Sequence, residues 1–408
     1  MNILLINHYA GSKEYGMEYR PYYLAREWVK QGHQVTIVGA SFSHLRLKNP
    51  DVKEDYSVED IEGIRYIWFK TPAYGGSIAR IKNMLIFMRK LYKYSERLAD
   101  DVKPNLVIAS STYPLDNYPA YKIANMCGAK YAYEIHDLWP LSPMLIGDYS
   151  KWHPFIMVMQ RAEDFAYKHV DKVVSLLWNA EIHCKERGLP QGKFVCIPNG
   201  YNPDEWSEDK FKLLLPDEHQ KAFERLKNKL IIGFAGGFAA SGTIDVLVKA
   251  AAKLKERKDL HVVLVGKGPE KSIYEQIIKE NGLDNVTILS PVSKLLIPAI
   301  DSHFDICFLG GVHSPLHKYG TSPNKLTDYM LCGKPIVYAV DEPGSVVERE
   351  DCGIRVEAEN VDEVTKAILK FTSMTDDKRN AMGERGRKYA ETLKWSVLAD
   401  KFINAFVD

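Results

Sequence analysis

Short apolar runs alternate with stretches of helical pattern along this chain, and no other feature constrains its fold as strongly. The first half holds six apolar runs, at 2–9, 33–40, 65–69, 105–110, 130–137 and 172–177. The rhythm restarts at 230 with five more, at 230–237, 261–268, 285–292, 304–311 and 334–340. Helical stretches separate them, for example at about 21–31, 244–256, 270–280 and 323–331. Strands that alternate with helices build parallel sheets covered on both faces, so the pattern predicts an α/β fold with two doubly wound domains.

The region around residue 200 marks the expected boundary between these domains. A chain of 408 residues exceeds the size at which one hydrophobic core usually stops growing. Pro198, Gly200 and Pro203 interrupt the regular pattern, and a charged stretch follows at 207–229. We therefore expect one domain at 1–205 and a second at 206–394. Two helical stretches end the chain, and the last, about 395–408, can pack back onto the first domain.

Charge balance and cysteine usage limit the classes of function. The 54 Lys and Arg residues nearly cancel the 53 Asp and Glu residues, so no global field attracts nucleic acid or a membrane. The six cysteines lack CxxC spacing, which is typical of reduced thiols in a cytosolic protein. The N-terminus lacks the pattern of a secretory signal, and no run approaches the ~20 apolar residues of a membrane span. We expect a cytoplasmic protein whose contact with a membrane is peripheral.

The segment 317–335 has the pattern of an anion-binding helix terminus. Ser322 is a good N-cap and Pro323 a good first helical residue, so a helix should begin there with unpaired backbone N–H groups. Lys325 and Asp328 are three residues apart and share one helix face. This arrangement suits a diphosphate bound at the terminus and a ribose diol bound by Asp328. An ordinary capped helix with a surface ion pair is the alternative.

Glycines follow the first strand of the second half. The segment 233–243 is glycine-rich between a strand and a helix, which permits close approach of backbone to phosphate. Gly236 and Gly237 are the best candidates for that contact. A tight turn without a ligand explains the same glycines equally well.

A strand end in the first half presents His136 next to Asp137. Ligands collect at the carboxyl ends of parallel strands, so His136 is a candidate for a direct role. Glu134 shares its strand face with His136 and can orient the imidazole or be a paired core residue. A packed, hydrogen-bonded histidine is the alternative for His136.

A basic concentration lies at about 78–94. Arg80, Lys82, Arg89, Lys90 and Lys93 have no acid between them. At helical spacing an apolar side lies beside Lys82, Arg89 and Lys93, which is the pattern of a helix that lies on an anionic membrane surface. A helix that covers a sheet has the same pattern. The apolar side consists of Ile78, Ile81, Leu85, Met88 and Tyr92.

Four separated segments resemble one enzyme family in the expected order. They are NHYAGSKEYGMEYRPYYLAREWVKQGHQVTIV, YEIHDLWP, CIPNGYNPDEW and SPNKLTDYMLCGKPIV. Together they resemble the retaining GT-B glycosyltransferases of family 4, especially the aminosugar (fucosamine-type) transferases of bacterial O-antigen and capsule synthesis. The resemblance implies two Rossmann-like domains facing each other across a cleft. It further implies transfer of a sugar, an N-acetylated aminosugar, from a UDP-linked donor to a lipid-linked saccharide at the inner face of the bacterial plasma membrane, with retention of configuration.

The resemblance also assigns roles to residues. It places His136 against the donor sugar, and it places Gly16 and Arg20 in a loop that family members close over the donor diphosphate and acceptor. A surface loop with a solvated arginine is the alternative for that segment. The expected donor-binding residues are, in chain order, Gly16, Arg20, Gly236, Gly237, Lys294, Ser322, Asn324 and Lys325, and the expected catalytic residues are His136 and Asp328.

Two departures from the family pattern affect the expected chemistry. The family has two glutamates with seven residues between them, where this chain has Gly320 and Asp328. The family also often has an Arg and a Lys after the first strand of the second domain, where FAGGFAASGTIDV has neither. Phosphate binding should therefore rest on backbone N–H groups and on Lys294 and Lys325. A sugar-nucleotide epimerase and a catalytically inactive homologue remain the rival interpretations.

Metal-independent chemistry is expected, because the chain contains no Asp-x-Asp. Helix termini and lysines must then neutralise the leaving group, and we expect no cofactor besides the donor substrate. By resemblance, the departing diphosphate takes the proton of the acceptor.

Overall fold

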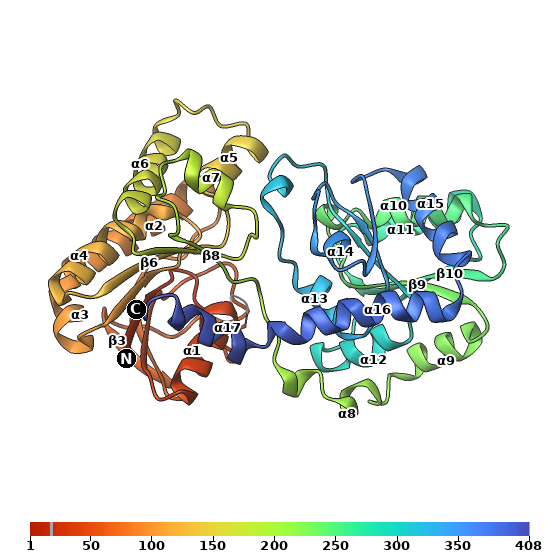
Figure 1. Ribbon diagram of the computed structural model, residues 1–408, viewed down its shortest axis with the longest axis horizontal. Helices are drawn as coiled ribbons and strands as arrows, with labels where there is room; N and C mark the ends of the chain where they lie inside the picture. Colours follow the sequence, from red (N-terminus) through yellow and green to blue (C-terminus); the bar gives the residue numbers. More distant parts are fainter. Residues whose placement is uncertain (17–18, 408) are drawn as a thin grey trace. The chain divides into compact units, whose positions relative to one another are not determined.

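A computed structural model describes residues 1–16 and 19–407 of the chain. The contacts divide the chain into two compact units. Unit 1 comprises Met1–Asn199, Tyr319–Thr321 and Trp395–Asp408, and unit 2 comprises Gly200–Lys318 and Ser322–Lys394. Each unit is a mostly parallel sheet with helices on both faces, which confirms the predicted pair of doubly wound α/β domains (Figure 1).

Unit 1 contains an eight-stranded sheet of order β3-β4-β2-β1-β5-β6-β7-β8. All neighbours pair in parallel except β3 and β4, which are antiparallel. The chain continues to opposite sides of β1, so the carboxyl ends of β1 and β5 form a topological switch point, where ligands of open α/β sheets bind. The strands are β1 (Asn2–Ile6), β2 (Gln34–Ala40), β3 (Ser57–Ile61), β4 (Ile64–Phe69), β5 (Leu106–Ala109), β6 (Lys130–Ile135), β7 (Lys172–Ser175) and β8 (Phe194–Cys196).

The sequence analysis missed β3, β8 and, in unit 2, β14 (Gly353–Val356). β3 has the sequence SVEDI and no fully buried residue, so it lacks the apolar run by which the other strands were found. An edge strand with acidic side chains pairs only with its hairpin partner and does not recruit further strands. β8 is short and only half-buried, and it ends at Cys196, where the segment interpreted as a hinge begins.

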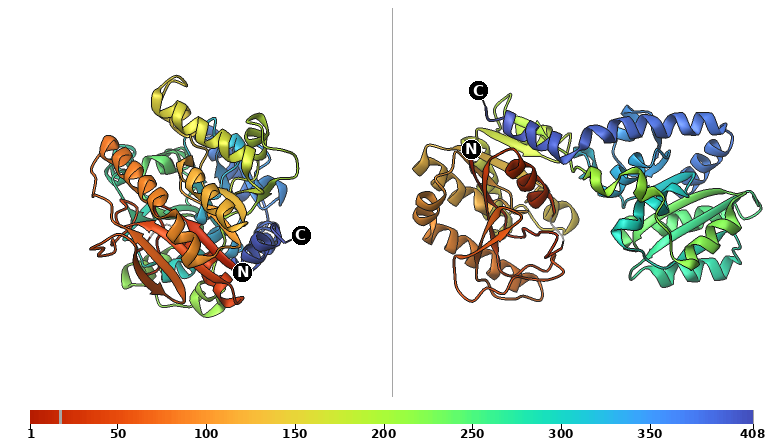
Figure 2. Two further views of the ribbon diagram at one scale, coloured as in Figure 1. Left: turned by 90° about the vertical axis from the view of Figure 1, so that its left-hand side faces the viewer. Right: turned by 90° about the horizontal axis from the view of Figure 1, so that it is seen from below.

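Helices of unit 1 include the last helix of the chain. α17 packs on α1 (Figure 2). Trp395 stacks on Tyr23 at 5.5 Å, and Trp28 Nε1 donates to the Ala399 carbonyl at 3.1 Å. The α-helices are α1 (Tyr19–Lys30), α2 (Ser77–Lys93), α3 (Ser95–Val102), α4 (Asn117–Cys127), α5 (Leu141–Ile146), α6 (Pro154–His169), α7 (Glu181–Glu186) and α17 (Trp395–Asn404).

Unit 2 contains a six-stranded parallel sheet of order β11-β10-β9-β12-β13-β14. Its switch point lies between β9 and β12. The strands are β9 (Leu230–Gly237), β10 (Leu260–Lys267), β11 (Val286–Leu289), β12 (Ile306–Gly310), β13 (Ile336–Ala339) and β14 (Gly353–Val356). The α-helices are α8 (Glu208–Phe211), α9 (Asp217–Leu226), α10 (Ile244–Lys253), α11 (Lys271–Asn281), α12 (Ile297–Ser302), α13 (Asn324–Leu331), α14 (Val346–Arg349), α15 (Val361–Thr372) and α16 (Asp376–Ala390).

The core of unit 2 fixes the strand that carries the glycines. Gly233 lies in β9, and a Cβ there would be 2.0 Å from the Phe304 ring, so this glycine is needed for packing rather than for a ligand. Within residues 1–16 and 19–407 no helix is both long and apolar enough to cross a bilayer.

Candidate functional site

The end of β9 and the first turn of α13 meet at the switch point of unit 2. Gly236 has a φ of 149°, and a Cβ on it would lie 2.1 Å from Cε and 2.8 Å from Nζ of Lys325. Only a glycine leaves room for this lysine. Gly237, the next residue, has no heavy atom within 4 Å of its Cβ position and is exposed. The structure therefore brings together Gly236 and Lys325, which the sequence analysis identified as candidates from two separate segments.

The Lys325 ammonium is poorly satisfied by protein atoms. It makes no hydrogen bond or ion pair with any described residue, and its nearest recorded partner is the Phe234 ring, with Nζ 5.1 Å from the ring centre. Burial lowers the pKa of Lys325, although Asp328 and Asp301 oppose the shift. A half-buried cation without a hydrogen-bond acceptor is stabilised by any anion that enters.

Two carboxyl groups lie beside this lysine. Burial raises the pKa of Asp328 to about 7, while Lys294 and Lys325 act in the opposite direction. Asp301 on α12 is fully buried, and neither of its carboxylate oxygens has a hydrogen-bond partner in the described chain. Burial and the charge of Asp328 raise the pKa of Asp301 well above its usual range. The sequence analysis missed Asp301, because α12 is short and its burial depends on the tertiary packing.

The start of α13 differs by one residue from the prediction. The helix begins at Asn324 with Pro323 at the N-cap position, and no side chain caps it, so Ser322 is not the N-cap. Pro323 has no backbone N–H to donate. Its backbone is extended, with a ψ of 132°, so the helical conformation starts only at the next residue. Asn324, the first helical residue, is exposed.

Lys294 forms an ion pair with a carboxylate, whereas the sequence analysis expected it to bind phosphate. Its ammonium is 2.7 Å from an Oε of Glu205, and the lysine side chain is 64% exposed. Its charge still reaches Asp328, whose pKa it lowers. Lys294 therefore belongs to the surroundings of Asp328, and its contact with a donor stays a proposal.

A second polar cluster lies at the carboxyl ends of β1, β5 and β6 in unit 1. Ser110 Oγ donates to Glu134 Oε2 at 2.6 Å, and His136 Nε2 lies 2.9 Å from Ser110 Oγ and 3.2 Å from Glu134 Oε2. Asn7 Nδ2 donates to the Ser110 carbonyl at 2.7 Å. Glu134 thus orients His136, which was one of the two roles considered for it. Sequence reasoning did not find Asn7 or Ser110, which follow β1 and β5 directly.

Glu134 stays ionised although it is fully buried. Burial would raise the pKa of Glu134, but Arg20, His136 and Ser110 outweigh it and lower the value to about 2. Because the acceptor next to Nε2 is an ionised carboxylate, the tautomer of His136 that fits carries its hydrogen on Nε2, and in that tautomer Nδ1 is a hydrogen-bond acceptor.

Arg20 is the main correction in unit 1. It was expected in a mobile loop over the diphosphate, but it lies in α1 and is only 5% exposed. Its Nε donates to Glu134 Oε1 at 3.0 Å, and its terminal nitrogens donate to the Ile197 and Pro198 carbonyls at 2.8 Å each. A buried carboxylate needs a paired cation, which explains this position.

Gly16 closes a tight turn in the segment before α1. Its N–H donates to the Ser12 carbonyl at 2.8 Å, its φ is 71°, and a Cβ there would lie 2.7 Å from Leu47 Cγ. The rest of the predicted flexible loop includes residues 17 and 18, which lie outside the described residues.

Gly320 has a specific structural reason to lack a side chain. Its φ is 99°, and a Cβ on it would be 2.5 Å from Cδ1 and 2.9 Å from the backbone nitrogen of Trp178. The adjacent Tyr319 carbonyl accepts from the Asn179 N–H at 3.0 Å. An acidic side chain does not fit at residue 320 in this arrangement.

α2 presents a different face from the predicted one. Met84, Phe87, Met88 and Leu91 are buried, so Met88 does not belong to an outward apolar side. Exposed positions seven residues apart hold Ile78 (86%), Leu85 (54%) and Tyr92 (44%).

The basic residues of α2 divide into two groups. Lys90 Nζ pairs with Asp55 at 2.5 Å, and Arg80 donates to the Tyr9 hydroxyl at 3.2 Å. Lys82, Arg89 and Lys93 remain exposed beside the outward apolar row.

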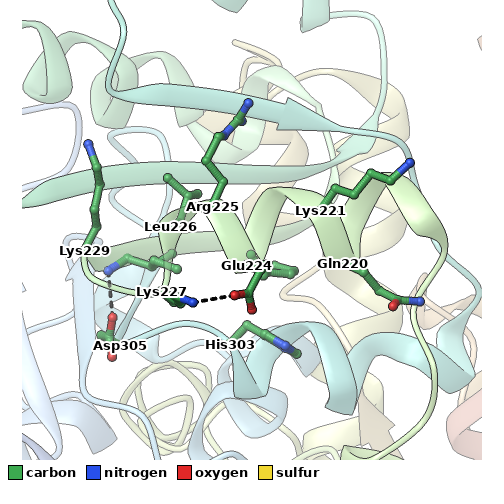
Figure 3. Close-up of a pocket in the computed structure, with 11 residues that line it drawn as sticks. Gln220, Lys221, Glu224, Arg225, Leu226, Lys227, Lys229, His303 and Asp305 are labelled. Atoms are coloured by element: carbon green, nitrogen blue, oxygen red, sulfur yellow. Dashed lines mark hydrogen bonds and ion pairs between the residues drawn. The ribbon is translucent and has the colours of Figure 1, made fainter.

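An open pocket of about 890 Å³ lies at the other end of the unit 2 sheet (Figure 3). It is lined by Lys221, Arg225 and Lys229 among others, and it includes Ile231 at the start of β9 and Asp305 just before β12. Asp305 accepts from the Ile231 N–H at 2.7 Å. The pocket is therefore at the amino ends of the strands, away from the switch point, and we do not assign the donor to it.

No group of three or more His, Cys, Asp or Glu side chains suited to a metal ion occurs within residues 1–16 and 19–407.

Two family models match the chain, one in each half. A glycosyl transferase 4-like domain matches residues 15–200, and the family described as glycosyl transferases group 1 matches residues 216–389. An uncharacterised glycosyltransferase from Methanocaldococcus jannaschii is 22% identical over 229 residues, which are 55% of this chain and 56% of the relative. The match thus spans about half the length of that relative.

Solved structures match over nearly their whole length. Sucrose-phosphate synthase from Thermosynechococcus elongatus has a TM-score of 0.67 and 18% identity, with 99% of this chain and 98% of that chain covered. HepE from Anabaena in complex with UDP has a TM-score of 0.66 and 14% identity, with 100% and 99% covered. WaaG, a glycosyltransferase involved in lipopolysaccharide biosynthesis, has a TM-score of 0.63 and 14% identity, with 98% of each chain covered. At these identities the likeness is one of fold.

The fold and the family matches agree on the class of protein: this chain is a GT-B glycosyltransferase with two Rossmann-like domains. Its N-terminal half carries a glycosyl transferase 4-like domain and its C-terminal half a domain of the glycosyl transferases group 1. The resemblance found in the sequence is confirmed at this level.

Proposed function

We propose that this glycosyltransferase moves an N-acetylated aminosugar from a UDP-linked donor to a lipid-linked saccharide during bacterial surface polysaccharide synthesis. The observation that supports it best is the Lys325 ammonium, which lies half-buried against Gly236 without a hydrogen-bond acceptor in the described chain. A nucleotide diphosphate supplies the missing acceptors. The complex of Anabaena HepE with UDP, a structure of similar fold, favours uracil as the base.

Each donor group has a proposed partner in unit 2. Lys325 and the backbone of Gly236 and Gly237 bind the diphosphate, helped by the open N-terminus of α13 at Asn324. Asp328 accepts hydrogen bonds from the ribose diol in its ionised form. Ser322 and Lys294 are the remaining donor contacts in the proposal, and Lys294 stands in for the Arg and Lys that the family often has after the first strand of the second domain.

In unit 1, His136 is the proposed contact to the donor sugar. Its Nδ1 accepts a hydrogen bond from a sugar hydroxyl, because Glu134 holds the hydrogen on Nε2. Arg20 acts through Glu134 as a positioning residue rather than by touching phosphate. Gly16 shapes the loop that leads into α1.

The proposed reaction retains the anomeric configuration and needs no metal. The bond between the anomeric carbon and the β-phosphate oxygen breaks, and the acceptor oxygen forms its bond on the same face of the sugar. The proton of the acceptor hydroxyl passes to the departing phosphate oxygen. Lys325 and the backbone N–H groups stabilise the negative charge that develops on the diphosphate.

The acceptor side of the proposal places the protein at a membrane surface. Lys82, Arg89 and Lys93 lie beside the outward row of Ile78, Leu85 and Tyr92 on α2. Cations near an anionic bilayer contribute about 1 kcal/mol each. This arrangement suits a peripheral protein on the inner face of a bacterial plasma membrane, where lipid-linked acceptors are found.

The test is calorimetric titration of UDP into the parent and into Lys325→Ala, with sugar transfer followed in parallel. We expect Lys325→Ala to lose most of the UDP affinity, and His136→Ala to lower turnover with little change in UDP affinity. Lys279→Ala is the matched control, since it removes an exposed lysine of unit 2 in the last turn of α11, away from the carboxyl ends of the strands. Unchanged UDP affinity in Lys325→Ala would exclude this site for the donor.

A further inference from the structure

The end of α5 and the connection from it to α6 expose a cluster of large apolar side chains. Ile146 is 71% and Trp152 72% exposed, and Leu145 and Tyr149 are 40% and 42% exposed. All four lie within eight residues. Trp152 is the only exposed one among the seven tryptophans, all of which lie in the described part of the chain. Isolated exposed apolar residues are common, but a tryptophan and an isoleucine projecting from one short loop indicate an interaction surface.

Local hydrogen bonds hold this loop in place. The Gly147 N–H donates to the Pro143 carbonyl at 3.0 Å, and a Cβ on Gly147 would be 2.8 Å from the same oxygen. The His153 N–H donates to the Ser150 carbonyl at 2.9 Å, and the Tyr149 and His153 rings meet edge to face at 5.1 Å. Hydrogen bonds within the backbone thus hold this segment, while Ile146 and Trp152 remain mostly exposed.

The size and chemistry of the cluster indicate which partner covers it. Four side chains of these exposures offer on the order of 400 Å² of apolar surface, whereas a stable protein interface needs about 800 Å² per partner. Tryptophan and tyrosine prefer the interface between lipid headgroups and acyl chains. Lys151 lies over the Trp152 ring, with Nζ 5.2 Å from the ring centre, so a cation accompanies the aromatic residue toward anionic headgroups. Asp148 is the one acid in the loop.

We propose that Leu145, Ile146, Tyr149 and Trp152 form an insertion loop that enters the interface of an anionic bilayer. This inference deepens the proposed function and rests on it, because a lipid-linked acceptor must be reached at the membrane. The exposed cations of α2 attract anionic headgroups, whereas the apolar side chains of the insertion loop enter the bilayer interface. α5 starts five residues after His136, so the segment that ends in the proposed catalytic histidine continues directly into the part that contacts lipid.

The experiment uses the full chain and vesicles of phosphatidylglycerol and phosphatidylcholine. Tryptophan fluorescence is recorded with lipids brominated near the headgroup, for the parent and for Trp152→Phe. Vesicle flotation compares the parent with Ile146→Ser/Trp152→Ser at low and high salt. Leu214→Ser is the matched control, because Leu214 is 81% exposed in unit 2. UDP titration on every variant reports folding and the donor site independently.

Brominated lipid should quench the parent at least twice as strongly as Trp152→Phe. The double variant should lose the binding that remains at high salt, while Leu214→Ser floats like the parent. Equal quenching of parent and Trp152→Phe, or equal flotation of the double variant at high salt, overturns the insertion loop. A parent dimer that the double variant converts to a monomer would assign the loop to a second copy and also overturn it. Failure of UDP binding in the parent would instead refute the proposed function, while quenching and flotation would still test the insertion loop.

Discussion

Replacing Gly236 by alanine tests the donor site at the point where two chain segments meet. The new Cβ would lie 2.1 Å from Lys325 Cε and 2.8 Å from Nζ. Carbon atoms in contact prefer 3.5–4.0 Å, so the end of the lysine must move by roughly 1.5 Å. Its long side chain can move without unfolding the domain, and the ammonium then leaves the position from which it reaches a diphosphate.

The expected loss of affinity follows from the bond that this displacement removes. A hydrogen bond to a charged group contributes about 1.5–3 kcal/mol, which corresponds to a roughly 10- to 150-fold weaker binding of UDP. The φ of Gly236 is 149°, which an L side chain rarely adopts. We therefore expect an additional loss of stability of about 1–2 kcal/mol.

The assay is UDP titration with Gly75→Ala as the matched control. Gly75 is an exposed glycine of unit 1 whose Cβ position has no atom within 4 Å, so UDP affinity should stay near that of the parent. In a double-mutant cycle, Gly236→Ala should cost almost nothing more once Lys325→Ala is present, because both changes remove one interaction. A folded Gly236→Ala protein with parental affinity, or strictly additive losses, would refute the role given to Lys325.

Three further predictions concern protonation, stability and metal. Burial raises the pKa of Asp328 to about 7, and because the ionised form binds ribose, UDP affinity should fall by up to about tenfold per pH unit below 7. Asp328→Asn should remove that component and leave only the titration of UDP itself, and an unchanged slope counts against the assignment. The pKa of Asp301 is raised in the folded state, so the contribution of this carboxyl to stability is most favourable in acid and is lost as pH rises above about 4. Asp301→Asn should raise stability by about 1–3 kcal/mol at pH 8 and much less at pH 4, and equal melting curves at pH 8 would contradict this. Transfer should persist in excess EDTA, and a rate that collapses and returns with Mg²⁺ or Mn²⁺ would show that a metal takes part.

The elements that the sequence predicted share one property, which is an apolar run long enough to show its period. β1, β9 and β10 are buried along nearly their whole length, so their apolar sequences predict them as strands. β3 and β14 are not buried in this way, and they were missed because their pairing partners rather than their composition make them strands. Tertiary contacts decide such segments.

Site residues followed a similar division. Lys325, Gly236 and His136 stand at strand ends or helix starts, which the sequence pattern locates. The partner of a side chain depends on distant backbone, so the ion pairs of Arg20 with Glu134 and of Lys294 with Glu205 were not predictable. Both cations were assigned to phosphate from the sequence, and both have a carboxylate partner in the structure.

Gly320 gives the departure from the family pattern a physical explanation. A glutamate there would need a Cβ 2.5 Å from Trp178 and a left-handed backbone, which glycine alone adopts without strain. The segment around Tyr319 packs closely on Trp178 and Asn179, and this close packing leaves no room for an acidic side chain at residue 320. Restoring the acid by Gly320→Glu should then lower stability instead of raising activity. It follows that the loss of the first acid does not by itself argue for an inactive homologue, because the packing of residue 320 accounts for it.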